Sequence, residues 1–119
     1  MTAQHAEEAD GPLISQPAMT REALRDAVRR IDMAALVFFD KECHEAFDRA
    51  AETGAINPLR FFLMKWATHV AIQRWPARAA ALREAERSAG DPKATEEQFR
   101  AAMATSSRIL AEAQREIGL

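Results

Sequence analysis

The sequence is poor in the residues that build redox, metal and phosphate sites. One residue in 119 is cysteine, so neither an intramolecular disulfide nor a multi-cysteine zinc site can form. Only four are glycine, each at a position that suits a tail or a helix end. The sequence has no glycine-rich phosphate loop, no G-x-S-x-G elbow and no H-E-x-x-H pair. We therefore expect a protein that is not an enzyme and has no cofactor.

Excess positive charge is also lacking. The formal net charge is −2, whereas nucleic-acid-binding proteins usually present a basic surface. There is no polybasic stretch that would attract anionic lipid. Arginine outnumbers lysine 13 to 3, but the arginines alternate with glutamates, as is usual on a solvated surface. We expect neither nucleic acid nor a membrane among the partners.

The N-terminus has none of the features of a secretory signal. Residues 1–18 contain acidic residues, a glycine and two prolines, but no basic region and no continuous apolar region. They also show no apolar periodicity, which is typical of disordered segments. The sequence predicts a disordered tail over residues 1–18 and a helical domain over residues 19–119, in a cytoplasmic protein.

What the sequence does contain is a succession of helix signals. Thr20 is a good N-cap for a first helix, and Asp32 is expected to cap a second helix that ends near Thr53, before Gly54. The first helix has an apolar stripe at helical spacing, made of Leu24, Ala27, Val28 and Ile31. The second has a similar stripe, made of Leu36, Phe39, Cys43, Phe47 and Ala50.

The second half of the chain has equally clear boundaries. Asn57-Pro58 predicts the start of a helix over residues 57–75, and Pro76 predicts the end of that helix and the start of the next. Thr95 with Gln98 forms a capping box for a long last helix over residues 95–117. The predicted fold is all-α, a single-domain bundle of about five helices.

The most apolar segment is RFFLMKWATHVAIQRWP, residues 60–76. Its 17 residues fall short of the roughly 20 that a bilayer crossing needs. Polar residues also occur along its whole length: Arg60, Lys65, His69, Gln73 and Arg74. Each charge at the bilayer centre costs about 3 kcal/mol. The segment is therefore not predicted to span a membrane.

This helix is apolar on two faces, so it must be covered on two sides. One face contains Leu63, Trp66 and Val70, with Phe62 at its edge. The second face could pack within the chain or against another chain, and Val37 and Phe38 lie off the main stripe of their own helix. Large apolar patches on a monomer often mark an interface. The candidate interaction residues are Val37, Phe38, Phe61, Met64, Ile72 and Trp75.

The last helix carries apolar positions in a regular four-three alternation. The positions are Phe99, Met103, Ser106, Leu110, Ala113 and Ile117. This heptad spacing is typical of a coiled-coil seam, but three heptads are few for a free coiled coil. We expect a long helix that packs antiparallel on a bundle through this seam.

One polar cluster could bind a metal. Asp40, His44 and Asp48 recur every four residues on one helix face, and His69 could complete a ligand set from another helix. No paired Glu-x-x-His motif accompanies them, so a solvated acidic face is the simpler interpretation. Cys43 falls in an apolar stripe, where a free cysteine acts as a small hydrophobic residue.

The segment NPLRFFLMKWATHVAIQRWPARAAALREAE, residues 57–86, resembles a stretch of small, uncharacterised actinobacterial helical proteins that form a domain-of-unknown-function family. The shared features are a Pro-Leu-Arg start, a central Trp, a Val-Ala-Ile-x-Arg run, a proline and a Leu-Arg-Glu-Ala-Glu ending. The resemblance implies a bacterial origin and a role beside a partner gene product. It implies no catalytic residues.

These observations favour a non-enzymatic interaction or regulatory module. It could be a homodimer or one component of a bacterial two-protein, antitoxin-like pair, so the expected partner is another protein chain, self or heterologous. The alternative is a helical bundle that binds a small molecule or a metal through Asp40, His44, Asp48 and His69.

Overall fold

The computed structural model describes residues 11–119, and every regular element in that range is a helix. The all-α prediction is therefore confirmed. The first ten positions of the predicted tail, residues 1–18, lie outside the described residues. The elements are α2 (Arg21–Ile31), the 3₁₀ turn η1 (Met33–Ala35), α3 (Leu36–Thr53), α4 (Asn57–Gln73), α5 (Pro76–Ala89) and α6 (Glu96–Glu116).

The helix ends are set by local capping. The Thr20 hydroxyl accepts a hydrogen bond from the Ala23 N–H at 3.2 Å and starts α2. Gly54 ends α3 in the left-handed conformation, with φ of 70°, which glycine adopts at little cost. At α6 both halves of the Thr95–Gln98 capping box are formed, at 3.1 Å and 2.9 Å.

Helix α4 ends at Gln73, two residues before the predicted end. The residue that precedes a proline is pushed out of the helical region by the proline ring. Trp75 accordingly has extended backbone angles, φ −106° and ψ 102°, and Pro76 then occupies the start of α5. The proline both stops one helix and begins the next.

The described chain divides into two compact units, and the division falls inside α4. We call residues 14–70 the aromatic unit, and residues 71–119 with residues 11–13 the hairpin unit.

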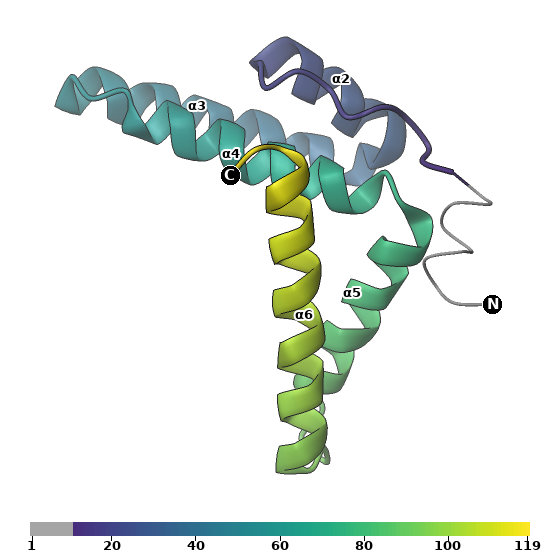
Figure 1. Cartoon of the computed structure of the whole chain (residues 1–119). Helices are drawn as coiled ribbons and strands as arrows, with labels where there is room; N and C mark the ends of the chain where they lie inside the picture. The colour runs from purple at the N-terminus through teal and green to yellow at the C-terminus, as the bar shows by residue number, and fades with distance from the viewer. Residues whose placement is uncertain (1–10) are drawn as a thin grey trace. The chain divides into compact units, whose positions relative to one another are not determined.

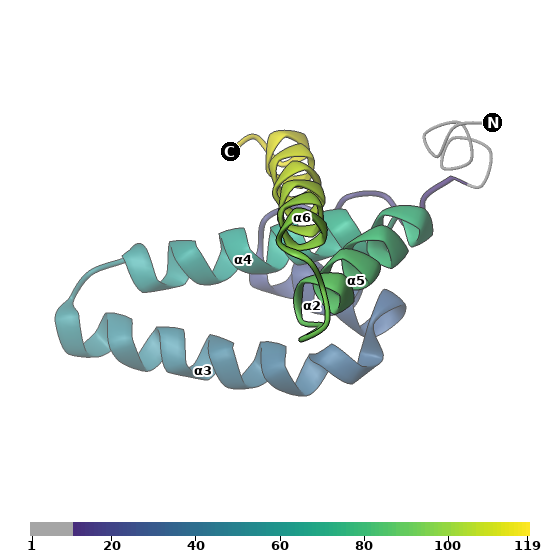
Figure 2. The same ribbon diagram turned by 90° about the horizontal axis from the view of Figure 1, so that it is seen from below.

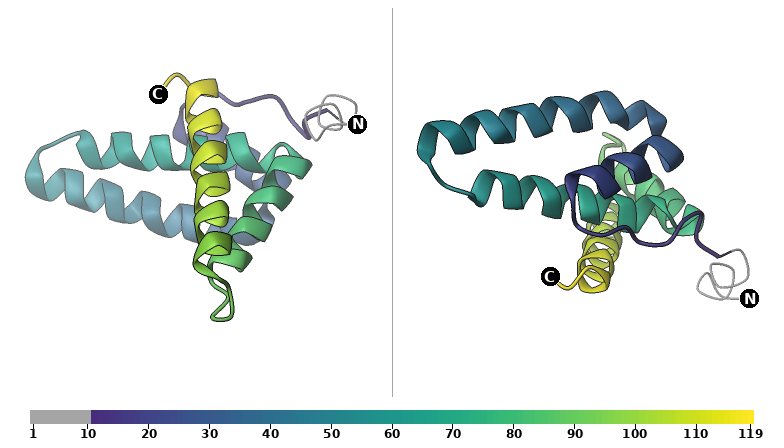
Figure 3. Two further views of the ribbon diagram at one scale, coloured as in Figure 1. Left: turned by 60° about the horizontal axis from the view of Figure 1, so that its bottom comes forward. Right: turned by 90° about the horizontal axis from the view of Figure 1, so that it is seen from above.

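In the aromatic unit, α3 and the first part of α4 lie side by side in opposite directions, as Figures 2 and 3 show. Three rings join them: the centre of the Phe39 ring lies 5.0 Å from that of Phe62 and 5.2 Å from that of Trp66. Tilted and edge-on pairs at this separation are favourable aromatic geometries. Leu24 and Val28 of α2 are fully buried in the same unit, so its core is made of large side chains.

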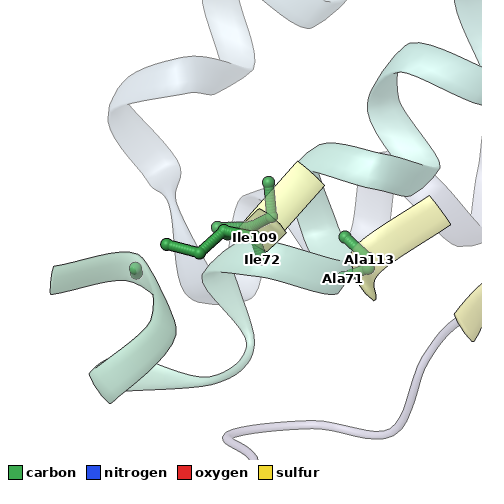
Figure 4. Packing of buried hydrophobic residues seen from close by; sticks show 5 residues of the cluster. Ala71, Ile72, Ile109 and Ala113 are labelled. Atoms are coloured by element: carbon green, nitrogen blue, oxygen red, sulfur yellow. The ribbon is translucent and has the colours of Figure 1, made fainter. Parts of the chain in front are cut away.

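In the hairpin unit, α5 and α6 run side by side in opposite directions (Figure 1). The core is a small cluster in which alanine outnumbers larger residues (Figure 4). Its buried members are Ala71, Ile72, Ala79, Ile109 and Ala113. Alanines at a helix contact let the two backbones approach closely, because few side-chain atoms lie between them.

A charged cluster links the end of α6 to the start of α5 within this unit. The Glu116 carboxylate contacts Arg74 at 2.9 Å and also contacts Arg78, which donates a second hydrogen bond to the Ala71 carbonyl at 3.0 Å. Both arginine side chains are largely buried. The two guanidinium groups also lie over the Trp75 ring, at 5.1 and 5.8 Å from its centre.

Two details differ from the sequence-based expectations for α2 and α3. Asp32 stands before η1, but its side chain makes no capping hydrogen bond and instead contacts His69, 37 residues away. Phe47, expected in the buried stripe of α3, is about half exposed beneath the Arg21 guanidinium, 5.7 Å from the ring centre. Ala46 is buried instead. The buried face of α3 consists of Phe39, Cys43 and Ala46, and Phe47 lies outside it.

The seam of α6 also differs from the expectation. Of its six positions only Ala113 is buried, while Phe99, Met103 and Leu110 are exposed. The buried side of α6 consists of Ala102, Ile109 and Ala113. At 100° per residue this side lies about 80° around the helix from the exposed positions. The expected antiparallel packing is present, but α6 uses a neighbouring face for it.

Candidate functional site

Large apolar side chains are exposed in η1 and at the start of α3 in the aromatic unit. Met33, Val37 and Phe38 are 64%, 67% and 59% exposed, and they follow one another within a turn and a half of chain. Scattered exposed apolar residues are normal, but neighbouring ones of this size are typical of contact surfaces. The structure thus places both Val37 and Phe38, selected from the sequence, on the surface.

A hollow of about 420 Å³ lies farther along α3, between α3 and α4, and Lys41 is the first residue of α3 that lines it. Phe61, which is 63% exposed, lines it from α4, and Lys65 forms a 2.6 Å ion pair with Glu42 at its wall. Its lining combines apolar side chains with charges of both signs. Such a surface suits a protein segment with mixed side chains better than a small ligand, which usually needs a deeper and more apolar cavity.

The other selected residues of α4 and the α4–α5 joint occupy different surroundings. Met64 is partly buried, and Trp75 is partly buried beneath two arginines. Ile72 is 4% exposed and packs in the core of the hairpin unit, with Ile109 and Ala113 (Figure 4). Ile72 is thus a core residue of the chain, and it is not part of an exposed surface.

The four candidate metal ligands do not converge. Both carboxylate oxygens of Asp40 accept hydrogen bonds from Arg25 at 2.9 Å, and this pairing lowers the pKa of Asp40. His69 contacts Asp32 through Nε2 at 2.7 Å, while His44 and Asp48 are exposed on α3. Among residues 11–119 no three His, Cys, Asp or Glu side chains are grouped so that they could hold a metal ion. The geometry gives the metal-binding alternative no support.

Cys43 is a free thiol buried in the contact between α3 and its neighbours. Its ring-bearing neighbour in sequence, His44, is exposed. The two side chains therefore point to different environments, as positions one residue apart on a helix must. His44 is therefore not placed to act as a base for the Cys43 thiol.

The structure adds one contact that sequence reasoning missed, and it corrects the surroundings of one row of residues. The contact is the one between Asp32 and His69, in which the imidazole also lies edge-on to Trp66, with ring centres 5.0 Å apart. No local pattern could signal a contact across 37 residues. The row is the exposed one on α6, which we call the α6 stripe: Phe99, Met103 and Leu110. The heptad spacing identified these residues, but it could not tell which side of α6 faces α5.

None of the helices within residues 11–119 is long and apolar enough to cross a membrane. No protein family model, no curated protein and no solved structure matches this chain. The resemblance to small actinobacterial helical proteins therefore stays a prediction, and the function has to be argued from the surfaces described above.

Proposed function

We propose that this chain is a non-enzymatic interaction module that acts by binding another protein chain. It would do so either as a homodimer or as one component of a bacterial two-protein, antitoxin-like pair. The observation that carries the proposal is the exposure of Met33, Val37 and Phe38 at the start of α3. Leaving three large apolar side chains in water costs free energy that a bound partner would recover.

A second feature of the same unit supports the same function. The hollow between α3 and α4 offers one more exposed ring, Phe61, and charged side chains that include Lys41 and Glu45. An apolar centre with a polar rim is the usual anatomy of a protein interface. An aromatic side chain at such a centre often contributes most of the binding free energy. Phe38 and Phe61 are the side chains best suited to that role.

The proposal is tested by the native mass of the protein isolated from its own cells under gentle conditions. We expect a mass above that of one chain, and we expect Phe38→Glu to reduce it to one chain while the helical content stays unchanged. Placing a charge at the centre of an apolar contact leaves that charge desolvated and unpaired. Ala51→Glu is the matched control, because it adds the same charge at an exposed position of the same helix.

The outcomes separate clearly. Extra mass that Phe38→Glu removes and Ala51→Glu retains supports the proposal, and it identifies the partner as self or heterologous. Extra mass that both variants retain places the contact elsewhere and removes the α3 surface from the proposal. A wild-type chain that is found only alone overturns the interaction function.

A further inference from the structure

The hollow between α3 and α4 lies on the side of α3 that faces away from α2. Arg25 of α2 pairs with Asp40, and Arg21 of α2 lies over the Phe47 ring. Glu45, in the middle of the α3 residues that line the hollow, lies about 140–160° around the helix from these two contacts. Every lining residue belongs to α3 or α4. Within the aromatic unit, the α3–α4 pair thus has α2 on one side and the hollow on the other.

The walls of the hollow are two rows of side chains at helical spacing. The α3 row is Lys41, Glu45 and Arg49, and the α4 row is Pro58, Phe61 and Lys65. Positions three or four apart lie above one another on a helix, so each row is a ridge that runs along its helix. A groove between two such ridges suits a third helix, which is the helix-in-groove mode of recognition.

Phe38 extends the α3 row by one turn. It lies three residues before Lys41 and within about 20° of Glu45 around the helix. Its side chain is 59% exposed, and that of Phe61 in the facing row is 63% exposed. The α3 surface and the hollow are therefore parts of one groove side, with an exposed ring in each part.

The ion pair between Glu42 and Lys65 sets the level of the second ring. This 2.6 Å contact joins facing positions of the two antiparallel helices (Figure 2). Phe61 lies one turn before Lys65. It therefore stands beside Ala46, one turn after Glu42, and Ala46 also lines the hollow. Along the groove Phe38 and Phe61 are thus about eight residues of helix apart, or roughly 12 Å.

The charge of the hollow is positive where it is not compensated. Three cations and two carboxylates line it. Glu42 is engaged by Lys65, and Glu45 lies 4.0 Å from Lys41. Arg49 is the remaining cation, and its guanidinium makes no ion pair and no hydrogen bond within residues 11–119.

Arg49 stands at one end of the hollow, beside Pro58 in the same register. Glu52 follows three residues later, but it does not line the hollow, and no ion pair joins it to Arg49 in the described part of the chain. A guanidinium binds a carboxylate through two parallel hydrogen bonds, and such charge-assisted pairs are stronger than neutral ones. The exposed Arg49 therefore favours a partner with a carboxylate at this end of the groove.

We propose that this groove binds a helix of the partner protein that carries two apolar side chains two turns apart and a carboxylate one turn beyond the second. The apolar side chains cover Phe38 and Phe61, and the carboxylate pairs with Arg49. This inference rests on the proposed function and deepens it by naming the chemistry of the partner. A helix with a basic residue at that position places like charges together, which excludes it as the occupant.

The test uses two end-blocked peptides of about twelve residues, roughly 18 Å long as helices. The acidic probe carries leucines two turns apart and glutamates one turn beyond the second leucine. The basic probe is the same peptide with lysine in place of each glutamate. Fluorescence anisotropy of the labelled probes measures their binding to the purified full chain. We expect the acidic probe to bind at least tenfold more tightly than the basic one.

A charge reversal in the hollow should reverse this preference. In Arg49→Glu the new carboxylate repels the acidic probe and attracts the basic one. Arg60→Glu is the matched control, because Arg60 is exposed, has no ion pair in the described chain and lies at least 100° around α4 from each lining residue of that helix. It should keep the wild-type preference. Circular dichroism establishes that both variants retain the wild-type helical content.

Phe61→Ser separates the apolar contact from the charge. It removes a ring that both probes cover, so it should weaken both probes by a similar factor and leave their ratio unchanged. Equal binding of the two probes to the wild type, no binding of either, or an Arg49→Glu chain that still prefers the acidic probe overturns the inference.

These results are distinguishable from a failure of the proposed function, because the native mass is measured without any probe. If Phe38→Glu removes a partner chain from the native mass but the wild type binds both probes equally, the interaction function stands and the acidic helix is wrong. If the wild type prefers the acidic probe but is found alone in its cells, the hollow has the inferred preference and the interaction function is wrong.

Discussion

The aromatic unit and the hairpin unit are built from similar helices but fill their interiors differently. In the aromatic unit Phe39, Phe62 and Trp66 occupy the contact between α3 and α4. In the hairpin unit the cluster formed by the end of α4, α5 and α6 contains mostly alanine, with Ile72 and Ile109 as its only large buried residues. Large rings keep helices apart and supply much buried area, whereas alanines supply little area and let the helices approach.

This difference changes which substitutions each unit tolerates. A core of rings loses a large volume when one ring is removed, and the surrounding helices can refill only part of the cavity. A core of alanines has little to lose by truncation, but it has no room for added atoms. Removal of side-chain atoms should therefore destabilise the aromatic unit more than the hairpin unit. Addition of side-chain atoms should destabilise the hairpin unit more.

The largest effect is expected for Phe39→Ala in the aromatic unit. Phe39 is fully buried and contacts both other rings, so its truncation should lower the free energy of unfolding by about 3–5 kcal/mol. Urea unfolding followed by circular dichroism measures it. Phe38→Ala, the same change at an exposed neighbour, should cost less than about 0.5 kcal/mol in dilute solution. Equal effects of the two substitutions would contradict the assignment of α3 faces.

Ala113→Leu should have a smaller but clear effect in the hairpin unit. Ala113 is fully buried in the cluster that the end of α4, α5 and α6 form, so the added atoms should force the helices apart at a cost of about 1–3 kcal/mol. The same unfolding measurement applies. Ala104→Leu adds the same atoms at an exposed position of α6 and should be nearly neutral. A stabilising Ala113→Leu would mean that the contact holds unfilled space, and the comparison between the units would fail.

Much of the helical layout could be predicted because its signals are local. The Thr95–Gln98 capping box, Gly54 and Pro76 act within one turn of chain, so the sequence defined the ends of α6, α3 and α5 closely. Asp32 shows where this reasoning stops. Its local pattern is that of a helix cap. The fold brings His69 close to the Asp32 carboxylate, which contacts His69 and makes no capping hydrogen bond. Contacts between distant residues leave no local pattern.

For the candidate surfaces, the sequence could predict which residues share a helix side, but not whether that side is exposed. Periodicity correctly grouped Phe99, Met103 and Leu110, because helical spacing alone decides which residues share a side. Which side faces the rest of the unit depends on helix packing, and the alanines at 102 and 113 allowed a closer approach on the adjoining side. Ile72 shows the opposite case. The sequence predicted it as an interaction residue on a surface, but it is buried in the core of the hairpin unit.

The smallest effect in this series is expected for Asp40→Asn in the aromatic unit. Arg25 donates two hydrogen bonds to the Asp40 carboxylate, which lowers the pKa of that carboxyl. Both side chains are nearly half exposed, so solvent screens the pair and its contribution is small. At neutral pH the substitution should lower the Tm by about 1–2 °C.

The pH dependence gives this last prediction its sign. Because the pKa of Asp40 is lower in the folded chain than in the unfolded chain, the pair stabilises the fold fully above the unfolded value of about 4. That contribution is lost as the pH falls through the folded value. The Tm difference between wild type and Asp40→Asn should thus be constant above about pH 5 and disappear in stronger acid. Asp48→Asn, which removes the same charge from α3 at a position with no ion pair in the described chain, is the matched control. A difference that persists at low pH would mean that Asp40 acts through packing and not through its charge.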